Sequence, residues 1–175
     1  MASSTEPRAS RPHMPGYGVL PADQGTGLLP WSWALQRLRD SHDYWVATVW
    51  PDGRPHTMPV WAVWDDGTLW FSASLRSRKI RNIQAGSAVS MSTEDPRNPV
   101  VLEGTAEIVT EPGALQRFLD GMNAKYGTDY PLEFLAPARN ASVRVRPRWA
   151  FGVAEKDFEG SPTRWEFGLG AGSAQ

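Results

Sequence analysis

Short stretches of β-branched and aromatic residues recur along the 175-residue chain, separated by turn signals such as Pro-Asp-Gly and Asp-Asp-Gly. This pattern is typical of strands joined by tight turns. Links of two or three residues connect the first three strands, so these strands form an antiparallel meander, because a parallel crossover needs a longer connection. The predicted strands cover 44–50, 55–64, 68–74, 88–93, 99–109 and 141–155, and TRWEFG at 163–168 closes the ordered chain.

Apolar residues at near-helical spacing predict three short helices, at about 30–40, 77–86 and 111–126. Ser77 and Thr110 are the candidate N-caps of the second and third helices. Many short strands and few helices predict a mainly β fold, a small antiparallel barrel with helices packed at its ends. A doubly wound parallel fold is not expected, since the chain lacks a GxGxxG turn and a GxxxxGK[ST] loop.

The composition fits one globular domain, with 41% hydrophobic residues. We expect this domain over 28–168, between a flexible tail at 1–27 that is rich in Pro, Gly and Ser and a second flexible tail at 169–175. The absence of cysteine excludes disulfides and thiolate chemistry and suits a reducing compartment. No apolar run is long enough for a bilayer span, so we expect a cytoplasmic protein with no membrane partner.

The charge is nearly balanced, with 18 basic and 19 acidic residues. This balance argues against nucleic acid as a partner, because a polyanion binder needs a broad basic surface. Any anion-binding role must therefore be local. The three histidines, His13, His42 and His56, are scattered, and without cysteine they give no metal site.

The segment ASLRSRKIRNIQAG at 73–86 concentrates cations at the start of the second predicted helix. A helix N-terminus already carries partial positive charge, so Arg78 and Lys79 in its first turn are unfavourable unless an anion faces them. A phosphate would use the free N–H groups, the guanidinium and nearby hydroxyls. A solvated basic helix face is the alternative, and the residues alone leave both interpretations open. The candidate hydroxyls are those of Ser72, Ser74 and Ser77.

Pro59 interrupts the hydrogen-bonding pattern of the predicted strand at 55–64. Because proline removes a backbone donor, this strand must lie at a sheet edge or carry a bulge. An edge strand with irregular backbone, flanked by Met58, Val60 and Trp61, is also a platform for a planar ring whose polar edge bonds to the main chain. An ordinary edge strand explains the same residues.

Three segments, DGRPHTMPVW, FSAS…SRKIRN and VVLEGTAE, carry a family resemblance. With their spacing they resemble the pyridoxamine 5'-phosphate oxidase-like split β-barrel superfamily, and more narrowly its actinobacterial flavin- and deazaflavin (F420)-dependent oxidoreductases. The resemblance covers about 29–167 and implies a split β-barrel, FMN-binding-like fold. It also implies a homodimer with a cofactor at each side of the subunit interface.

The resemblance assigns site residues in two groups. One group would contact the cofactor phosphate or ribityl chain: Ser72, Ser74, Ser77, Arg78, Lys79 and Asn82. The other would contact the ring: Thr57, Met58, Pro59, Val60 and Trp61. Classical pyridoxamine phosphate oxidases carry an additional Arg and Lys on the ring-binding strand, where this chain has His56, Met58 and Trp61.

The choice of cofactor depends on the remaining cations. Coenzyme F420 continues beyond its phosphate into an acidic tail, and Arg76 and Arg81, with Arg54 as a further candidate, are available to meet it. We therefore expect F420, with FMN as the alternative. The expected activity is hydride transfer from reduced F420 to an unsaturated or conjugated small organic acceptor.

The alternatives to that activity are an FMN-binding oxidase-like protein and a non-catalytic carrier of flavin or deazaflavin. Because the cofactor supplies the hydride, no catalytic acid or base is assigned. Arg164 and Trp165 are candidates for the substrate pocket, although aromatic residues at this position could equally pack the dimer.

Overall fold

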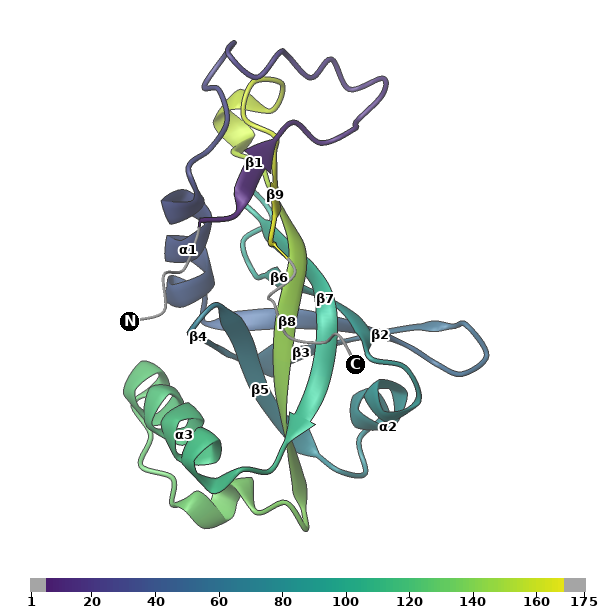
Figure 1. Cartoon of the computed structure of the whole chain (residues 1–175), viewed down its shortest axis with the longest axis vertical. Helices are drawn as coiled ribbons and strands as arrows, with labels where there is room; N and C mark the ends of the chain where they lie inside the picture. The colour runs from purple at the N-terminus through teal and green to yellow at the C-terminus, as the bar shows by residue number, and fades with distance from the viewer. Residues whose placement is uncertain (1–5, 169–175) are drawn as a thin grey trace.

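The computed structural model describes residues 6–168. Its strands form one antiparallel sheet in the order β1-β9-β8-β7-β6-β2-β3, while β5 pairs with both β4 and β8. The curled sheet is the expected split β-barrel (Figure 1). The strands are β1 Arg8–Ser10, β2 Asp43–Val49, β3 Pro55–Trp61, β4 Val63–Asp65, β5 Thr68–Ser74, β6 Ala88–Thr93, β7 Val100–Val109, β8 Asn140–Gly152 and β9 Thr163–Glu166.

Three α-helices lie against the sheet, as the sequence predicted. Figure 1 shows α1 and α3 on one side of the molecule and α2 on the other, beside the β2–β3 hairpin. The helices are α1 Trp31–Asp40, α2 Arg78–Ala85 and α3 Pro112–Tyr126, with 3₁₀ turns η1 Leu132–Leu135 and η2 Glu155–Asp157. No helix within residues 6–168 is long and apolar enough to cross a membrane.

Two apolar clusters hold the fold together. The main cluster fills the barrel and includes Leu69 and Phe71, both fully buried. The smaller cluster lies under α3, where Trp70 stacks on Phe118 with ring centroids 5.6 Å apart. Because successive strand residues point to opposite faces, β5 contributes to both clusters and joins α3 to the barrel.

The predicted strand at 55–64 is two strands, because the chain bends at Ala62 between β3 and β4. The prediction that Pro59 lies on an edge strand is confirmed, since β3 ends the sheet path. The predicted N-cap of α3, Thr110, is wrong. Glu111 takes that position, and its carboxylate accepts hydrogen bonds from the first N–H groups of the helix.

The expectation of a flexible tail over 1–27 is wrong where the structure describes it. Residues 8–10 form β1, which pairs with β9. The guanidinium of Arg11 then donates to four carbonyl oxygens and so fastens this segment to the loop before β9. Those carbonyls belong to Pro21, Gln24, Gly160 and Pro162. A composition rich in Pro and Gly did not reveal an anchor that depends on one arginine. The ends at 1–5 and 169–175 lie outside the described residues.

Candidate functional site

The free edge of β3 has an unusual set of backbone groups. Trp50 N–H donates to Arg54 C=O at 2.9 Å, which fixes the hydrogen-bonding phase of the β2–β3 hairpin. Continuing that alternation, the odd-numbered residues of β3 direct their backbone groups away from β2. Two of them, Pro55 and Pro59, have no N–H, so Thr57 N–H stands alone between them. The edge resists pairing with another strand but can bond to a small planar ring that carries both donors and acceptors.

The side chains of the predicted ring-binding residues are mostly exposed. Met58 is 43% exposed and Trp61 is 40% exposed, and Thr57 and Pro59 are exposed as well. Val60 differs, because its side chain belongs to the main core. Any contact of Val60 with a ring must therefore come from its backbone. The structure thus places four of the five predicted side chains on an open surface.

The start of α2 lies directly after β5 and contains unused polar groups. Ser77 occupies the predicted N-cap position, but its hydroxyl makes no capping bond and is buried with no partner. The turn before it is closed by Ser77 N–H donating to Ser74 C=O at 2.9 Å and Arg76 N–H donating to Ser74 Oγ at 3.2 Å. The Ser74 hydroxyl is therefore already engaged in the turn, whereas that of Ser77 is not. Ser72 lies two residues earlier on β5, beside Ser142 of β8.

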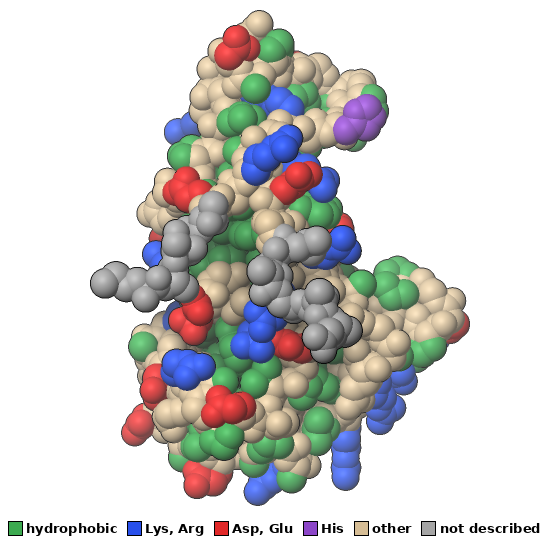
Figure 2. All heavy atoms as spheres, in the orientation of Figure 1, with side chains coloured by type: hydrophobic (Ala, Val, Ile, Leu, Met, Phe, Trp, Pro, Cys, Tyr) green, Lys and Arg blue, Asp and Glu red, His purple; other side chains and the backbone are tan. Residues whose placement is uncertain are grey.

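The cations at this helix start have no acidic partners. Within residues 6–168, no carboxylate lies within ion-pair distance of Arg76, Arg78, Lys79 or Arg81. Burial lowers the pKa of Lys79, because its ammonium is partly desolvated. Figure 2 shows Lys and Arg side chains along the edge of the molecule where Figure 1 places α2. An anion here would relieve a repulsion that the protein does not neutralise itself.

Trp50 connects this helix start to the hairpin that carries β3. Arg78 Cζ lies 3.6 Å from the centroid of the Trp50 ring, and Arg54 Cζ lies 4.4 Å from it. Cation–π contacts of this kind orient a guanidinium without neutralising it. The sequence did not indicate Trp50 as a site residue, because the contact joins positions 28 residues apart. Its only signal is an aromatic residue directly before the Pro-Asp-Gly turn.

Asn82 lies beneath the site rather than in it. It is 1% exposed, and its Nδ2 donates to Thr48 Oγ1 of β2 at 3.0 Å. Its Oδ1 and the Nδ1 of His56 are both buried without partners. Asn82 therefore fixes α2 on β2, and the predicted contact with a phosphate or ribityl chain would require it to move.

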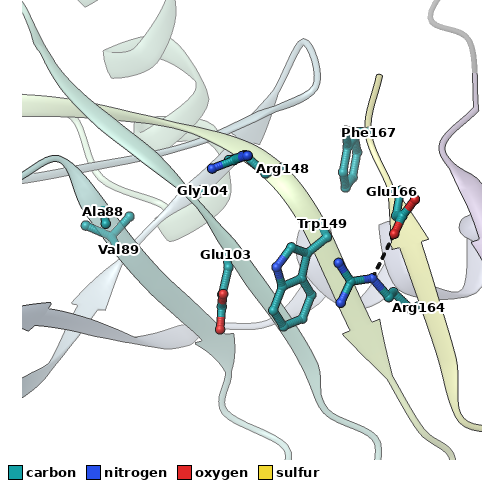
Figure 3. A pocket seen from close by; sticks show the side chains of 9 residues that line it. All are labelled: Ala88, Val89, Glu103, Gly104, Arg148, Trp149, Arg164, Glu166 and Phe167. Carbon is teal, nitrogen blue, oxygen red and sulfur yellow. Dashed lines mark hydrogen bonds and ion pairs between the residues drawn. The ribbon is translucent and has the colours of Figure 1, made fainter. Parts of the chain in front are cut away.

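A separate cavity of about 480 Å³ lies on the sheet face formed by β6 to β9. Arg164, predicted for a substrate pocket, lines this cavity with its Cζ 4.7 Å from the Trp149 ring centroid. Its Nε donates to Glu166 at 3.1 Å (Figure 3). The cavity residues that the sequence did not indicate are Ala88, Val89, Glu103, Gly104, Arg148, Trp149, Glu166 and Phe167.

The assignment of Trp165 to the substrate pocket is wrong for this chain. Trp165 is fully buried and packs edge-on against Trp31, with ring centroids 5.6 Å apart. Since Arg164 and Trp165 are neighbours on β9, their side chains point to opposite faces of the sheet. Only one of the two can face a cavity. Within residues 6–168 there is also no cluster of His, Asp or Glu that could hold a metal ion.

Comparisons with known proteins agree with this architecture. A solved structure described as an F420 reductase is 30% identical, with a TM-score of 0.54, and covers 68% of this chain and 95% of its own. A conserved hypothetical protein of Mycobacterium tuberculosis, Rv2991, is 25% identical, with a TM-score of 0.63, and covers 84% of this chain and 92% of its own. ChuZ of Campylobacter jejuni has the same fold at 13% identity and a TM-score of 0.66, over 77% of this chain and 58% of its own.

No curated protein matches the sequence. The family profile described as pyridoxamine 5'-phosphate oxidase matches residues 34–154. This match spans the barrel from α1 to the end of β8 and includes both the free edge of β3 and the start of α2. The chain therefore belongs to the pyridoxamine 5'-phosphate oxidase family.

Proposed function

We propose that the protein is an F420-dependent oxidoreductase that transfers a hydride from the reduced deazaflavin to an unsaturated or conjugated small organic acceptor. The observation that carries this proposal is the start of α2, where four cations have no carboxylate partner and the Ser77 hydroxyl is unused. A phosphate fits this set, because it supplies acceptors to the cations and to the free N–H groups at once.

The free edge of β3 would hold the ring of the same cofactor. Thr57 N–H is a donor, and the carbonyls of Pro55, Thr57 and Pro59 are acceptors along that edge. The ring edge of a flavin or deazaflavin has both carbonyl and N–H groups, so the two edges are complementary. The cofactor supplies the hydride when bound, and the residues of this chain bind it, orient it and exclude water.

Two features favour F420 over FMN. Arg76 and Arg81 are exposed next to the proposed phosphate site, where they can meet an acidic extension that FMN lacks. The F420 reductase noted above is 30% identical to this chain. FMN is the alternative cofactor, and a carrier without turnover is the alternative activity. Both would use the same phosphate site.

We also propose that the working form is a homodimer with the cofactor at the interface. The register places Trp45, Val49, Pro59 and Trp61 on one face of the β2–β3 hairpin. The side chains of Trp45 and Val49 are 47% and 53% exposed. Exposed apolar groups of this size beside an edge strand are typical of an interface. A second copy would cover the site that a single chain leaves open, and it could bring Arg164 near the ring.

The decisive experiment is a parallel titration of the purified protein with F420 and with FMN, followed by fluorescence. We expect tight binding of F420 with a change in its fluorescence and weaker binding of FMN. Reduced F420 should then be reoxidised on adding a suitable enone or quinone acceptor. Binding without reoxidation across a broad acceptor panel would favour the carrier. Binding of neither cofactor would reject the proposal.

A further inference from the structure

The last turn of α3 holds the end of β3 through one peptide. Ala62, which lies between β3 and β4, is 1% exposed. Its N–H donates to Tyr126 Oη at 2.8 Å, and its C=O accepts from Lys125 Nζ at 2.9 Å. Tyr126 Oη also lies 3.0 Å from the same carbonyl. Two side chains of α3 therefore replace the strand partner that this peptide lacks.

The ring of Tyr126 also fixes the last side chain of β3. It stacks on the indole of Trp61, with centroids 4.3 Å apart and planes 5° from parallel. The His42 ring meets both of them edge-on, at 5.8 Å from Trp61 and 5.2 Å from Tyr126. Trp61 remains 40% exposed, so the cluster covers part of the indole and leaves the rest open to a ligand.

The tyrosine itself is held firmly. Its hydroxyl donates to His42 C=O at 2.8 Å, and burial raises its pKa to about 12, so it stays neutral. Its neighbour Lys125 donates to Tyr44 Oη at 2.7 Å, and Tyr44 in turn donates to Leu38 C=O of α1. A polar network with all these partners satisfied gives position rather than chemistry.

We propose that Tyr126 is a positioning residue for the ring-binding strand. By stacking on Trp61 and bonding to Ala62, it keeps the indole at the end of the free edge and away from Thr57 N–H. A planar cofactor ring then meets a strand edge whose last side chain is already ordered, so binding costs less conformational entropy. This inference rests on the proposed function, because it assigns Tyr126 a role in holding the same ring.

The test compares Tyr126→Leu and Tyr126→Phe with a matched control, Tyr130→Leu. Tyr130 also stacks on an aromatic ring, that of Phe134 at 4.3 Å, but it lies after α3 and away from β3. We expect Tyr126→Leu to weaken F420 binding about tenfold. Tyr126→Phe, which keeps the stack, should lose less, and Tyr130→Leu should bind like the wild type.

A double-mutant cycle separates positioning from a general structural effect. If Tyr126 acts through Trp61, then Tyr126→Leu should cause no further loss of affinity in a Trp61→Leu background. Full additivity of the two losses, or wild-type affinity of Tyr126→Leu, would overturn the inference. If Tyr126→Leu does not fold, the same cycle is run with Tyr126→Phe.

A second readout does not depend on the cofactor. The indole N–H signal of Trp61 in a ¹⁵N correlation spectrum, assigned with Trp61→Phe, should shift in Tyr126→Leu because the ring current of the stack is lost. An unshifted signal would overturn the inference. A wild-type protein that binds neither cofactor would reject the proposed function, while this spectrum would still decide whether Tyr126 orders Trp61.

Discussion

Helices α2 and α3 both pack on the barrel, but their N-termini are built in opposite ways. At α3, the carboxylate of Glu111 accepts from Gly113 N–H at 2.7 Å and from Ala114 N–H at 2.6 Å. These hydrogen bonds hold the pKa of Glu111 below its usual value. At α2, Ser77 makes no capping bond, and Arg78 and Lys79 add positive charge to the first turn.

The difference indicates which helix start serves stability and which serves binding. A helix that only supports the fold should neutralise its own N-terminus, as α3 does. The start of α2 instead leaves N–H groups, cations and one hydroxyl unpaired within the described part of the chain. That arrangement lowers stability unless an anion is bound. The contrast can be tested by changing each helix start in turn.

The largest expected effect is at the two cations of the first turn of α2. Replacing both Arg78 and Lys79 with Ala should weaken cofactor binding about 100-fold or more, because charge-assisted bonds to phosphate are lost. The melting temperature of the free protein should not fall, since neither cation has an ion-pair partner in residues 6–168. Titration calorimetry and thermal unfolding measure the two quantities.

The control is a matched pair of cations far from this site, Arg97→Ala with Lys156→Ala. The side chain of Arg97 is 74% exposed, and both residues lie near η2 at the other end of the molecule. This control variant should bind the cofactor normally. Unchanged affinity of the Arg78 and Lys79 variant would show that the phosphate lies elsewhere.

The next effect separates the two cofactors. Replacing Arg76 and Arg81 with Ala should weaken F420 binding about tenfold and leave FMN binding almost unchanged, because only F420 carries an acidic tail. Parallel titrations at low and high salt check this, since the loss for F420 should shrink as salt screens the exposed arginines. Equal losses for both cofactors would place Arg76 and Arg81 at the phosphate instead.

Local sequence patterns predicted most of the fold. Alternation and turn residues placed the strands, and Pro59 correctly indicated that β3 lies on an edge. The failures occurred where a distant contact decides the structure. The bend at Ala62 depends on side chains of α3 more than sixty residues later, and β1 depends on pairing with β9. No local pattern contains that information.

The candidate site was predictable to a similar degree. The position of Ser77 at the start of α2 follows from the residues around it, and the structure agrees. Which side chains face the site does not follow from the residues. Asn82 is turned inward to Thr48, and Trp165 is turned into the core. Trp50 joins the site only because folding brings it against Arg78.

A smaller effect tests the contrast in capping directly. Glu111→Ala should lower the melting temperature by a few degrees and leave cofactor affinity unchanged, because α3 loses the acceptor for two N–H groups. Ser77→Ala should do the reverse, with unchanged melting and a measurable loss of affinity, since its hydroxyl is buried and caps nothing. The destabilisation by Glu111→Ala should shrink as the pH falls below the folded-state pKa of Glu111, where its carboxylate becomes protonated. If Ser77→Ala proves the more destabilising change, the contrast between the two helix starts is wrong.

The smallest effect concerns two partly buried lysines, Lys79 of α2 and Lys125 of α3. Burial lowers the pKa of both, and that of Lys125 falls to about 8, although Asp40, Asp43 and Glu94 oppose the shift. A lysine whose folded pKa is lowered binds fewer protons in the folded state than in the unfolded state. Its contribution to stability therefore rises with pH from about 8 to its unfolded value of 10.5.

The variants Lys79→Met and Lys125→Met isolate these contributions, measured as urea midpoints over this pH range. Without cofactor, the wild type should gain stability over each variant as the pH rises. Saturating cofactor should abolish that gain for Lys79, because an adjacent phosphate favours the charged ammonium and raises its pKa. It should leave the gain for Lys125 unchanged, because Lys125 already donates to Tyr44 Oη and Ala62 C=O. A cofactor effect on Lys125 alone would move the anion from α2 to the end of α3.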